Sequence, residues 1–90
     1  MSVAQTIREK LAAAFSPAAL EVEDESARHA GHSGARPEGE THFRVRIVSA
    51  TFEGLSRVER QRRVCAALAE EMNSRVHALA LVTLTPGELR

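Results

Sequence analysis

The sequence contains no tryptophan or tyrosine, only three phenylalanines and a single cysteine. A core with so few aromatic rings must be built mainly from aliphatic side chains. The single cysteine, Cys65, excludes a disulfide within the chain and any metal site in which this chain alone supplies several thiolates. No apolar run approaches the roughly 20 residues that a transmembrane helix needs, so we expect no association with a membrane.

Net charge is absent as well, because 12 Lys and Arg residues balance 12 Asp and Glu residues. A neutral chain has no strong nonspecific attraction to nucleic acid or to anionic lipid. The N-terminus carries charged residues at positions 8 to 10 and lacks the apolar segment of a signal peptide, so we expect a cytoplasmic protein. With 43% apolar and 27% charged residues among 90, we expect a single domain over residues 1–90.

Hydrophobic periodicity predicts alternating helical and extended segments. Ser2 and Ser56 each stand three residues before Gln or Glu, the spacing of a capping box at the start of a helix. The predicted elements are, in order, a helix over 2–15, strands over 19–24 and 41–49, a turn with a short helical piece over 51–56, a helix from Ser56 to about residue 73, and a strand over 75–84. This order predicts an α+β fold with helices packed on one face of a three-stranded sheet.

The apolar positions of these segments predict one core. Phe43, Val45 and Ile47 alternate with His42, Arg44 and Arg46, so the former should be buried and the latter should face water. We expect the buried set to contact Ile7, Leu11, Cys65 and Leu68 beneath the helices. On the long helix, we expect Val58, Cys65, Leu68 and Met72 to share the buried face, with Val64 alongside. The strand over 75–84 is apolar enough to be central or well covered.

Three of the four histidines, His29, His32 and His42, fall within residues 24–43, a segment that also holds three of the five glycines. A histidine-rich loop of this kind is typical of a solvated connection, a metal or cluster site, or a partner-binding surface. The residues alone leave these three alternatives open. His42 alternates with two arginines on the wet face of its strand, so we expect it to contact a partner or the neighbouring loop.

An ordered set of motifs runs almost from end to end of the chain: "IREKL", "LEVEDES", "GETHFRVRIVS", "FEGLSRVERQRRV", "LAEEM", "VHALAL" and "TP". In this order and spacing they resemble the BolA family. The resemblance implies an αββααβ fold similar to class II KH domains. It also implies a complex with a monothiol glutaredoxin that shares a bridging [2Fe-2S] cluster, acting in cluster trafficking or in iron and redox regulation.

The resemblance further implies which residues bind the cluster. His77, in "VHALAL", matches the family's C-terminal cluster histidine; the alternative is a histidine packed beside Leu79 and Leu81. The loop ligand is His29 when counted from "DES" and lies nearer His32 when counted from "ETHF", the alternative being two solvated histidines. The glutaredoxin and glutathione would supply the remaining ligands. We expect no tightly bound cluster in the isolated chain, which should be a monomer or a weak homodimer.

Some BolA family members have been described as DNA-binding transcriptional regulators, which is the second functional hypothesis. Arginines crowd the start of the long helix, and we expect Arg57, Arg60 and Arg63 to contact a partner protein or nucleic acid. The GXXG loop with which KH domains hold nucleotides reads "GLSR" here, at positions 54–57, so its second glycine is missing. This favours protein docking over DNA. No nucleophile–base pair or phosphate loop is evident, so we expect no enzyme.

Overall fold

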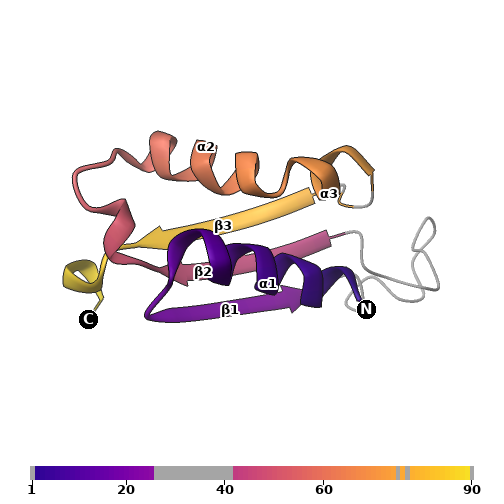
Figure 1. Cartoon of the computed structure of the whole chain (residues 1–90), viewed down its shortest axis with the longest axis horizontal. Coiled ribbons are helices and arrows are strands. Elements are labelled where there is room, and N and C mark those ends of the chain that lie inside the picture. Colours follow the sequence, from indigo (N-terminus) through magenta and orange to yellow (C-terminus); the bar gives the residue numbers. More distant parts are fainter. Residues whose placement is uncertain (1, 26–41, 75, 77, 90) are drawn as a thin grey trace.

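The computed structural model describes residues 2–25, 42–74, 76 and 78–89. Within these ranges the chain forms three helices, three strands and two short 3-10 turns. In order they are α1 (Val3–Phe15), β1 (Ala19–Asp24), β2 (His42–Val48), η2 (Ala50–Phe52), α2 (Arg57–Ala67), α3 (Ala69–Ser74), β3 (Ala78–Leu84) and η3 (Pro86–Glu88). The predicted αββααβ order and α+β class are confirmed (Figure 1).

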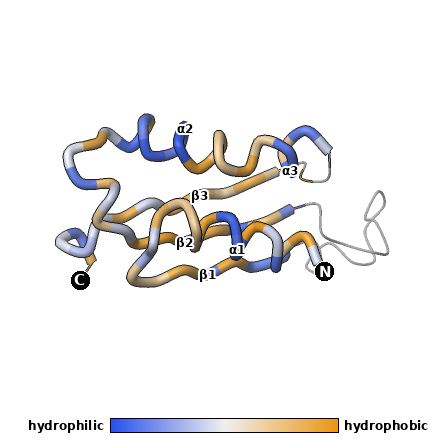
Figure 2. The backbone as a smooth tube through the Cα atoms, in the orientation of Figure 1, coloured by the Kyte–Doolittle hydropathy of each residue, from blue (hydrophilic) through white to orange (hydrophobic). Residues whose placement is uncertain are grey.

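The strands form one mixed sheet in the order β1-β2-β3, with β2 antiparallel to β1 and parallel to β3. Of the two alternatives expected for the last strand, central or well covered, the strand order excludes the first. β2 is the central strand and β3 is an edge strand. The apolar side chains Leu79 and Leu81 of β3 pack against the core. Figure 1 shows α1 lying over the sheet and α2 running along β3. In Figure 2 the first turns of α2 are largely hydrophilic, whereas β3 is hydrophobic.

α1 begins and ends where the sequence predicts. The Ser2 hydroxyl accepts a hydrogen bond from the Gln5 N–H at 3.1 Å, which satisfies one of the unpaired donors of the first turn. Ser16 then adopts a left-handed conformation with φ of 44°, and its N–H donates to the Ala12 carbonyl at 3.1 Å. Such a residue ends a helix, and Pro17 cannot continue it.

A single hydrophobic core lies between the helices and one face of the sheet. Phe43, Val45 and Ile47 of β2 are at most 1% exposed. They share this core with Ile7 and Leu11 of α1, as predicted, and with Val64, Leu68, Phe15, Phe52 and Val76. α1 and α2 therefore cover the same face of β2, and the opposite face of the sheet carries its polar side chains. No helix in the described ranges is long and apolar enough to cross a membrane.

The long helix differs from its prediction in two respects. It is interrupted at Leu68, which has φ of −107° and ψ of 21°, so α2 and α3 are separate helices. Its buried face also matches the prediction only in part: Leu68 and Val64 are buried and Met72 packs against the core, as expected. In contrast, Val58 is 58% exposed, and Cys65 is half-buried and is not in the core cluster of described residues. The buried stripe is Arg60, Val64 and Leu68, four residues apart. Val58 stands two residues from Arg60 and thus on the opposite side of the helix.

Candidate functional site

The strand ends that flank the candidate ligands in the sequence lie together at one end of the sheet. Asp24, the last residue of β1, pairs with Phe43, and His42, the first residue of β2, pairs with Ala78, the first of β3. The connection between β1 and β2 therefore leaves and re-enters the sheet at the end where β3 begins. His29 and His32 belong to that connection and His77 directly precedes β3; all three lie outside the described residues.

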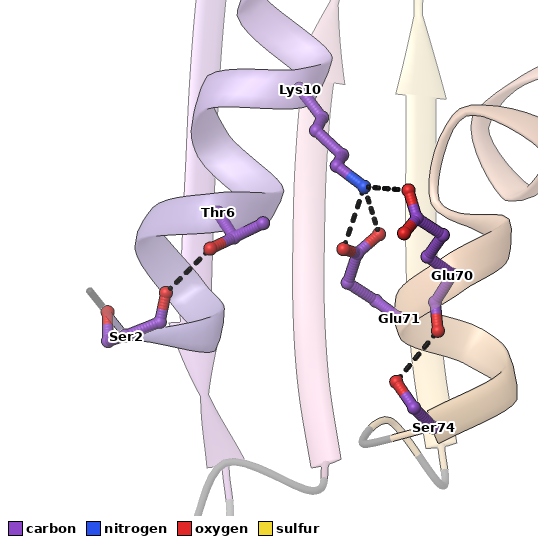
Figure 3. A network of polar contacts seen from close by, with 6 residues as sticks. All are labelled: Ser2, Thr6, Lys10, Glu70, Glu71 and Ser74. Carbon is purple, nitrogen blue, oxygen red and sulfur yellow. Dashed lines mark hydrogen bonds and ion pairs between the residues drawn. The ribbon is translucent and has the colours of Figure 1, made fainter.

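Val76, which precedes β3, is held by the core and by a hydrogen bond to α3. Val76 is 6% exposed, belongs to the core, and its N–H donates to the Glu71 carbonyl at 2.9 Å. The Glu71 carboxylate accepts in turn from the Lys10 Nζ at 2.8 and 3.0 Å, and Glu70 accepts from the same ammonium at 3.2 Å (Figure 3). This group, the Lys10 clamp with Glu70 and Glu71, links α1 to α3 through residues 60 and 61 positions apart in the chain.

The carboxylates of this clamp also raise the pKa of Lys10. The hydrogen bond to Glu71 raises the pKa of Lys10 above its usual value of 10.5, although partial burial opposes the shift. Glu71 is the more enclosed partner, with its side chain 13% exposed against 88% for Glu70. The clamp was not predicted from the sequence, because nothing in the spacing of Lys10 and Glu71 indicates that their helices touch.

The described residues do not by themselves form a metal site. Among them, no three His, Cys, Asp or Glu side chains come together as a group that could hold a metal ion. Cys65 is half-buried on α2. His42 lies at the sheet end described above, partly buried, and by strand alternation it shares the open face of β2 with Arg44 and Arg46.

The open face of the sheet carries charges of both signs. Arg46 and Glu21 are cross-strand neighbours with a nitrogen–oxygen distance of 3.6 Å, and Arg44 pairs in register with Glu23. With Val82, these four side chains line a shallow hollow. Acidic and basic groups alternate across it, so their fields largely cancel, and this face is not a strongly basic surface for nucleic acid.

The arginines at the start of α2 divide into three kinds. Arg57 is exposed and lines a hollow between α2 and β3. Arg62 and Arg63 are also exposed, and both lie within 4 Å of the Glu59 carboxylate, at 3.7 and 3.6 Å. Arg60 is 7% exposed and lies inside the protein.

The expectation that Arg60 contacts a partner or nucleic acid is therefore corrected. Its Nε donates to the Leu55 carbonyl at 3.0 Å, and one terminal nitrogen donates to the Thr83 carbonyl at 3.2 Å. The two terminal nitrogens also donate to the two carboxylate oxygens of Glu88 at 2.7 and 3.2 Å. All of these partners belong to the same chain, because the four-residue spacing from Arg60 to Val64 and Leu68 turns the guanidinium away from the open surface of the helix. That spacing was the signal in the sequence that could have revealed it.

Glu88 completes this internal network from the C-terminal turn. Besides pairing with Arg60, one of its carboxylate oxygens accepts from the Thr85 N–H at 2.8 Å. The Arg60 hydrogen bond and this backbone donor lower the pKa of Glu88 from 4.5 to about 2. The network joins α2, the end of β3 and η3, and sequence reasoning did not find it.

The turn before α2 caps a helix. Gly54 has φ of 82°, which glycine adopts without strain, and Leu55 gives its carbonyl to Arg60. The Ser56 hydroxyl accepts from the Glu59 N–H at 3.1 Å, as its capping-box spacing predicts. Arg57, at the position of the missing second glycine, is already the first helical residue. The groups of this turn are thus used to build the helix start.

Comparison with known proteins gives one consistent family. A family model described as BolA-like protein matches residues 11–88. BolA-like protein 1 of Homo sapiens is 51% identical over 98% of this chain and 61% of its own length. The DNA-binding transcriptional regulator BolA of Escherichia coli is 47% identical over 98% of this chain and 80% of its own. The solved structure of BolA1 from Arabidopsis thaliana is 43% identical, with a TM-score of 0.89 over 100% of this chain and 98% of that one. The chain spans less than two thirds of some curated relatives, and only 24% of SufE-like protein 1 of Arabidopsis thaliana.

Proposed function

The chain belongs to the BolA family, and from that premise we propose that it is an accessory protein that shares a [2Fe-2S] cluster with a monothiol glutaredoxin. Its role would lie in cluster trafficking or in iron and redox regulation. One observation carries the proposal. The end of β1, the start of β2 and the start of β3 lie together, and these three points flank His29, His32 and His77.

The proposed ligands are those that the resemblance to the BolA family implies, and their chemistry is compatible with a cluster. A cluster of this type needs four ligand atoms, and imidazole can replace some of the usual thiolates. The one thiol of this chain, Cys65, sits half-buried on α2 and has no thiolate beside it in the sequence to form a set. His77 and one of His29 and His32 would therefore bind the cluster, while the glutaredoxin and glutathione complete the four ligands. His42 starts β2 at the same sheet end and would contact the glutaredoxin.

DNA binding is the second candidate, supported by the name of the relative from Escherichia coli. The arrangement of the arginines speaks against it as the main role of this chain. Arg60 is buried and bound to groups of the same chain, and Arg62 and Arg63 both approach the carboxylate of Glu59. Phosphate binding draws on the summed charge of many free cations, and this helix start offers few. Protein docking therefore remains the better proposal for Arg57 and Arg63.

The test is reconstitution of the mixed cluster. The protein is combined with a monothiol glutaredoxin, glutathione, iron and sulfide, and visible absorption and circular dichroism are compared with those of the glutaredoxin alone. We expect a distinct spectrum that His77→Ala abolishes or strongly changes and that Cys65→Ser leaves nearly unchanged. Because imidazole binds iron only when its coordinating nitrogen is deprotonated, the mixed spectrum should weaken below about pH 6.

The loop ligand is tested by a separate set of variants. His29→Ala and His32→Ala are measured singly and together, and we expect the double variant to lose the mixed spectrum. Of the single variants, His29→Ala should have the larger effect. An unchanged spectrum in the double variant contradicts loop ligation, and an unchanged spectrum in His77→Ala contradicts the proposed function as a whole.

A further inference from the structure

The outer edge of β3 carries unpaired backbone groups in a defined pattern. The Ser49 N–H donates to the Leu84 carbonyl at 2.9 Å, so Leu84 points its backbone groups towards β2. The Thr83 carbonyl instead accepts from Arg60, on the other side of the strand. Backbone groups alternate in direction along a strand. The backbone N–H and carbonyl groups of Ala80 and Val82 therefore also point towards β2, whereas those of Leu79, Leu81 and Thr83 point away from it, towards the outer edge.

Arg60 and Glu88 occupy the end of this edge. The guanidinium donates to the Thr83 carbonyl, the last outward carbonyl of the strand. The carboxylate accepts from the N–H of Thr85, the residue that follows the strand. These are the positions at which an added strand would place its own donor and acceptor. Among the described residues, nothing pairs with the outward N–H and carbonyl groups of Leu79 and Leu81, or with the Thr83 N–H. Five backbone groups are thus left for a strand to bind.

A hollow of ≈ 150 Å³ lies beside this free edge. It is lined by Arg57 and Gln61 of α2, one helical turn apart, and by Leu81, Val82, Thr83 and Leu84 of β3. Arg57 makes no ion pair within the described part of the chain, in contrast to Arg62 and Arg63, which both approach Glu59. The hollow therefore combines a strand edge with one unpaired cation.

We propose that the edge of β3 from Leu79 to Thr83 binds an extended, acidic peptide segment of a partner protein, which adds to the sheet as a fourth strand. The backbone of the segment would satisfy the five outward groups, and a carboxylate on it would pair with Arg57. Addition of a strand at an exposed edge is a general mode of peptide recognition, in which main-chain hydrogen bonds give affinity and flanking side chains give specificity.

A peptide fits this edge better than the other occupants. A nucleic acid would meet a neutral strand edge and one free cation, too little charge for phosphate binding. A second copy of this chain would offer its own β3, whose sequence "ALALVTL" has no acidic residue and would leave Arg57 unpaired. The hollow also lies towards the C-terminal end of β3, where its lining residues Leu81 to Leu84 are about 10–20 Å from the end at which His42 and Ala78 pair, at 3.3 Å per residue. The proposal rests on the strand edge and on Arg57, and it does not require a cluster.

The first test measures amide hydrogen exchange by NMR on the protein alone. The amides of Ala80, Val82 and Leu84 should exchange slowly, and those of Leu79, Leu81 and Thr83 should exchange fast. Uniform protection along β3 would mean that its edge is already occupied and would overturn the proposal.

The second test selects binders from a display library of random octapeptides, and the enriched peptide is synthesised. We expect alternating β-branched residues with at least one Asp or Glu, and binding that slows exchange at Leu79, Leu81 and Thr83. Arg57→Gln should weaken binding about tenfold, whereas the matched variant Arg62→Gln, on the same helix but outside the hollow, should not. His77→Ala should bind the peptide like the unchanged protein, whatever its effect on a cluster.

Four outcomes would refute the proposal. The first is that no peptide is enriched, and the second is that both arginine variants weaken peptide binding equally. The third is that the peptide does not slow amide exchange in β3, and the fourth is that a single-stranded oligonucleotide binds more strongly than the peptide at physiological salt. Concentration-dependent protection of the same amides without peptide would identify a second copy as the occupant and would likewise overturn it.

Discussion

Replacing Arg60 by alanine should be among the most destabilising changes on α2, although arginine is usually a surface residue. The side chain is 7% exposed and donates to the carbonyls of Leu55 and Thr83 as well as to Glu88. Hydrogen bonds from a charged donor contribute about 1.5–3 kcal/mol each. The two bonds to backbone carbonyls therefore predict a loss of about 3–6 kcal/mol in the free energy of unfolding, with the exposed Glu88 left out of the sum.

Thermal and urea unfolding followed by circular dichroism measure this loss. For a domain of this size Tm changes by about 4–8 °C per kcal/mol, so a loss of about 3–6 kcal/mol corresponds to a fall in Tm of roughly 12–48 °C. The matched control is Arg63→Ala, which removes an exposed side chain paired with Glu59 at 3.6 Å and should cost at most about 1 kcal/mol. If Arg60→Ala costs no more than Arg63→Ala, the internal role of Arg60 is wrong.

The same pair of proteins gives a pH dependence with a defined sign. Arg60 and the Thr85 N–H together lower the pKa of Glu88 from 4.5 to about 2, so the stabilisation that the ionised carboxylate contributes through them is present above pH 4.5 and is lost as the pH falls towards 2. The difference in unfolding free energy between the unchanged protein and Arg60→Ala should therefore shrink over that interval. A constant difference from pH 6 to pH 2 would contradict the pairing of Arg60 with Glu88.

Three further predictions follow from the fold. Leu68→Ala should destabilise by about 2–5 kcal/mol in urea unfolding, and Val58→Ala, 58% exposed on the same helix, should be nearly neutral; a comparable loss in both variants would mean that Val58 is buried, as first expected for α2. The contribution of the Lys10 clamp should be fully present below pH 10.5 and be lost as the pH rises through the raised pKa of Lys10, so a difference between the unchanged protein and Lys10→Met that persists well above that pH would argue against the clamp. DNA affinity should be weak at physiological salt and fall steeply as salt rises, and sequence-specific nanomolar binding there would favour the regulator hypothesis over cluster sharing.

The candidate site could be predicted from the sequence only as a set of residue types and family positions. His29, His32 and His77 were chosen by the motifs around them, and the fold adds that the strand ends flanking them meet. Arg60 could not be assigned correctly by composition, because an arginine among other charged residues normally lies in solvent. Its partners at Leu55, Thr83 and Glu88 come from three other segments of the chain.

Local patterns determined the elements of this protein. Capping residues such as Ser2 and Ser56, the alternation through Phe43, Val45 and Ile47, and the stop at Pro17 act over a few residues, so they are legible in the sequence. Only the tertiary structure decided which strand is central, where the long helix breaks and which groups Arg60 contacts. These features depend on contacts between residues far apart in the chain, such as Lys10 with Glu71 and Arg60 with Glu88. Their energies are set by burial and by distance in space, which spacing along the sequence does not record.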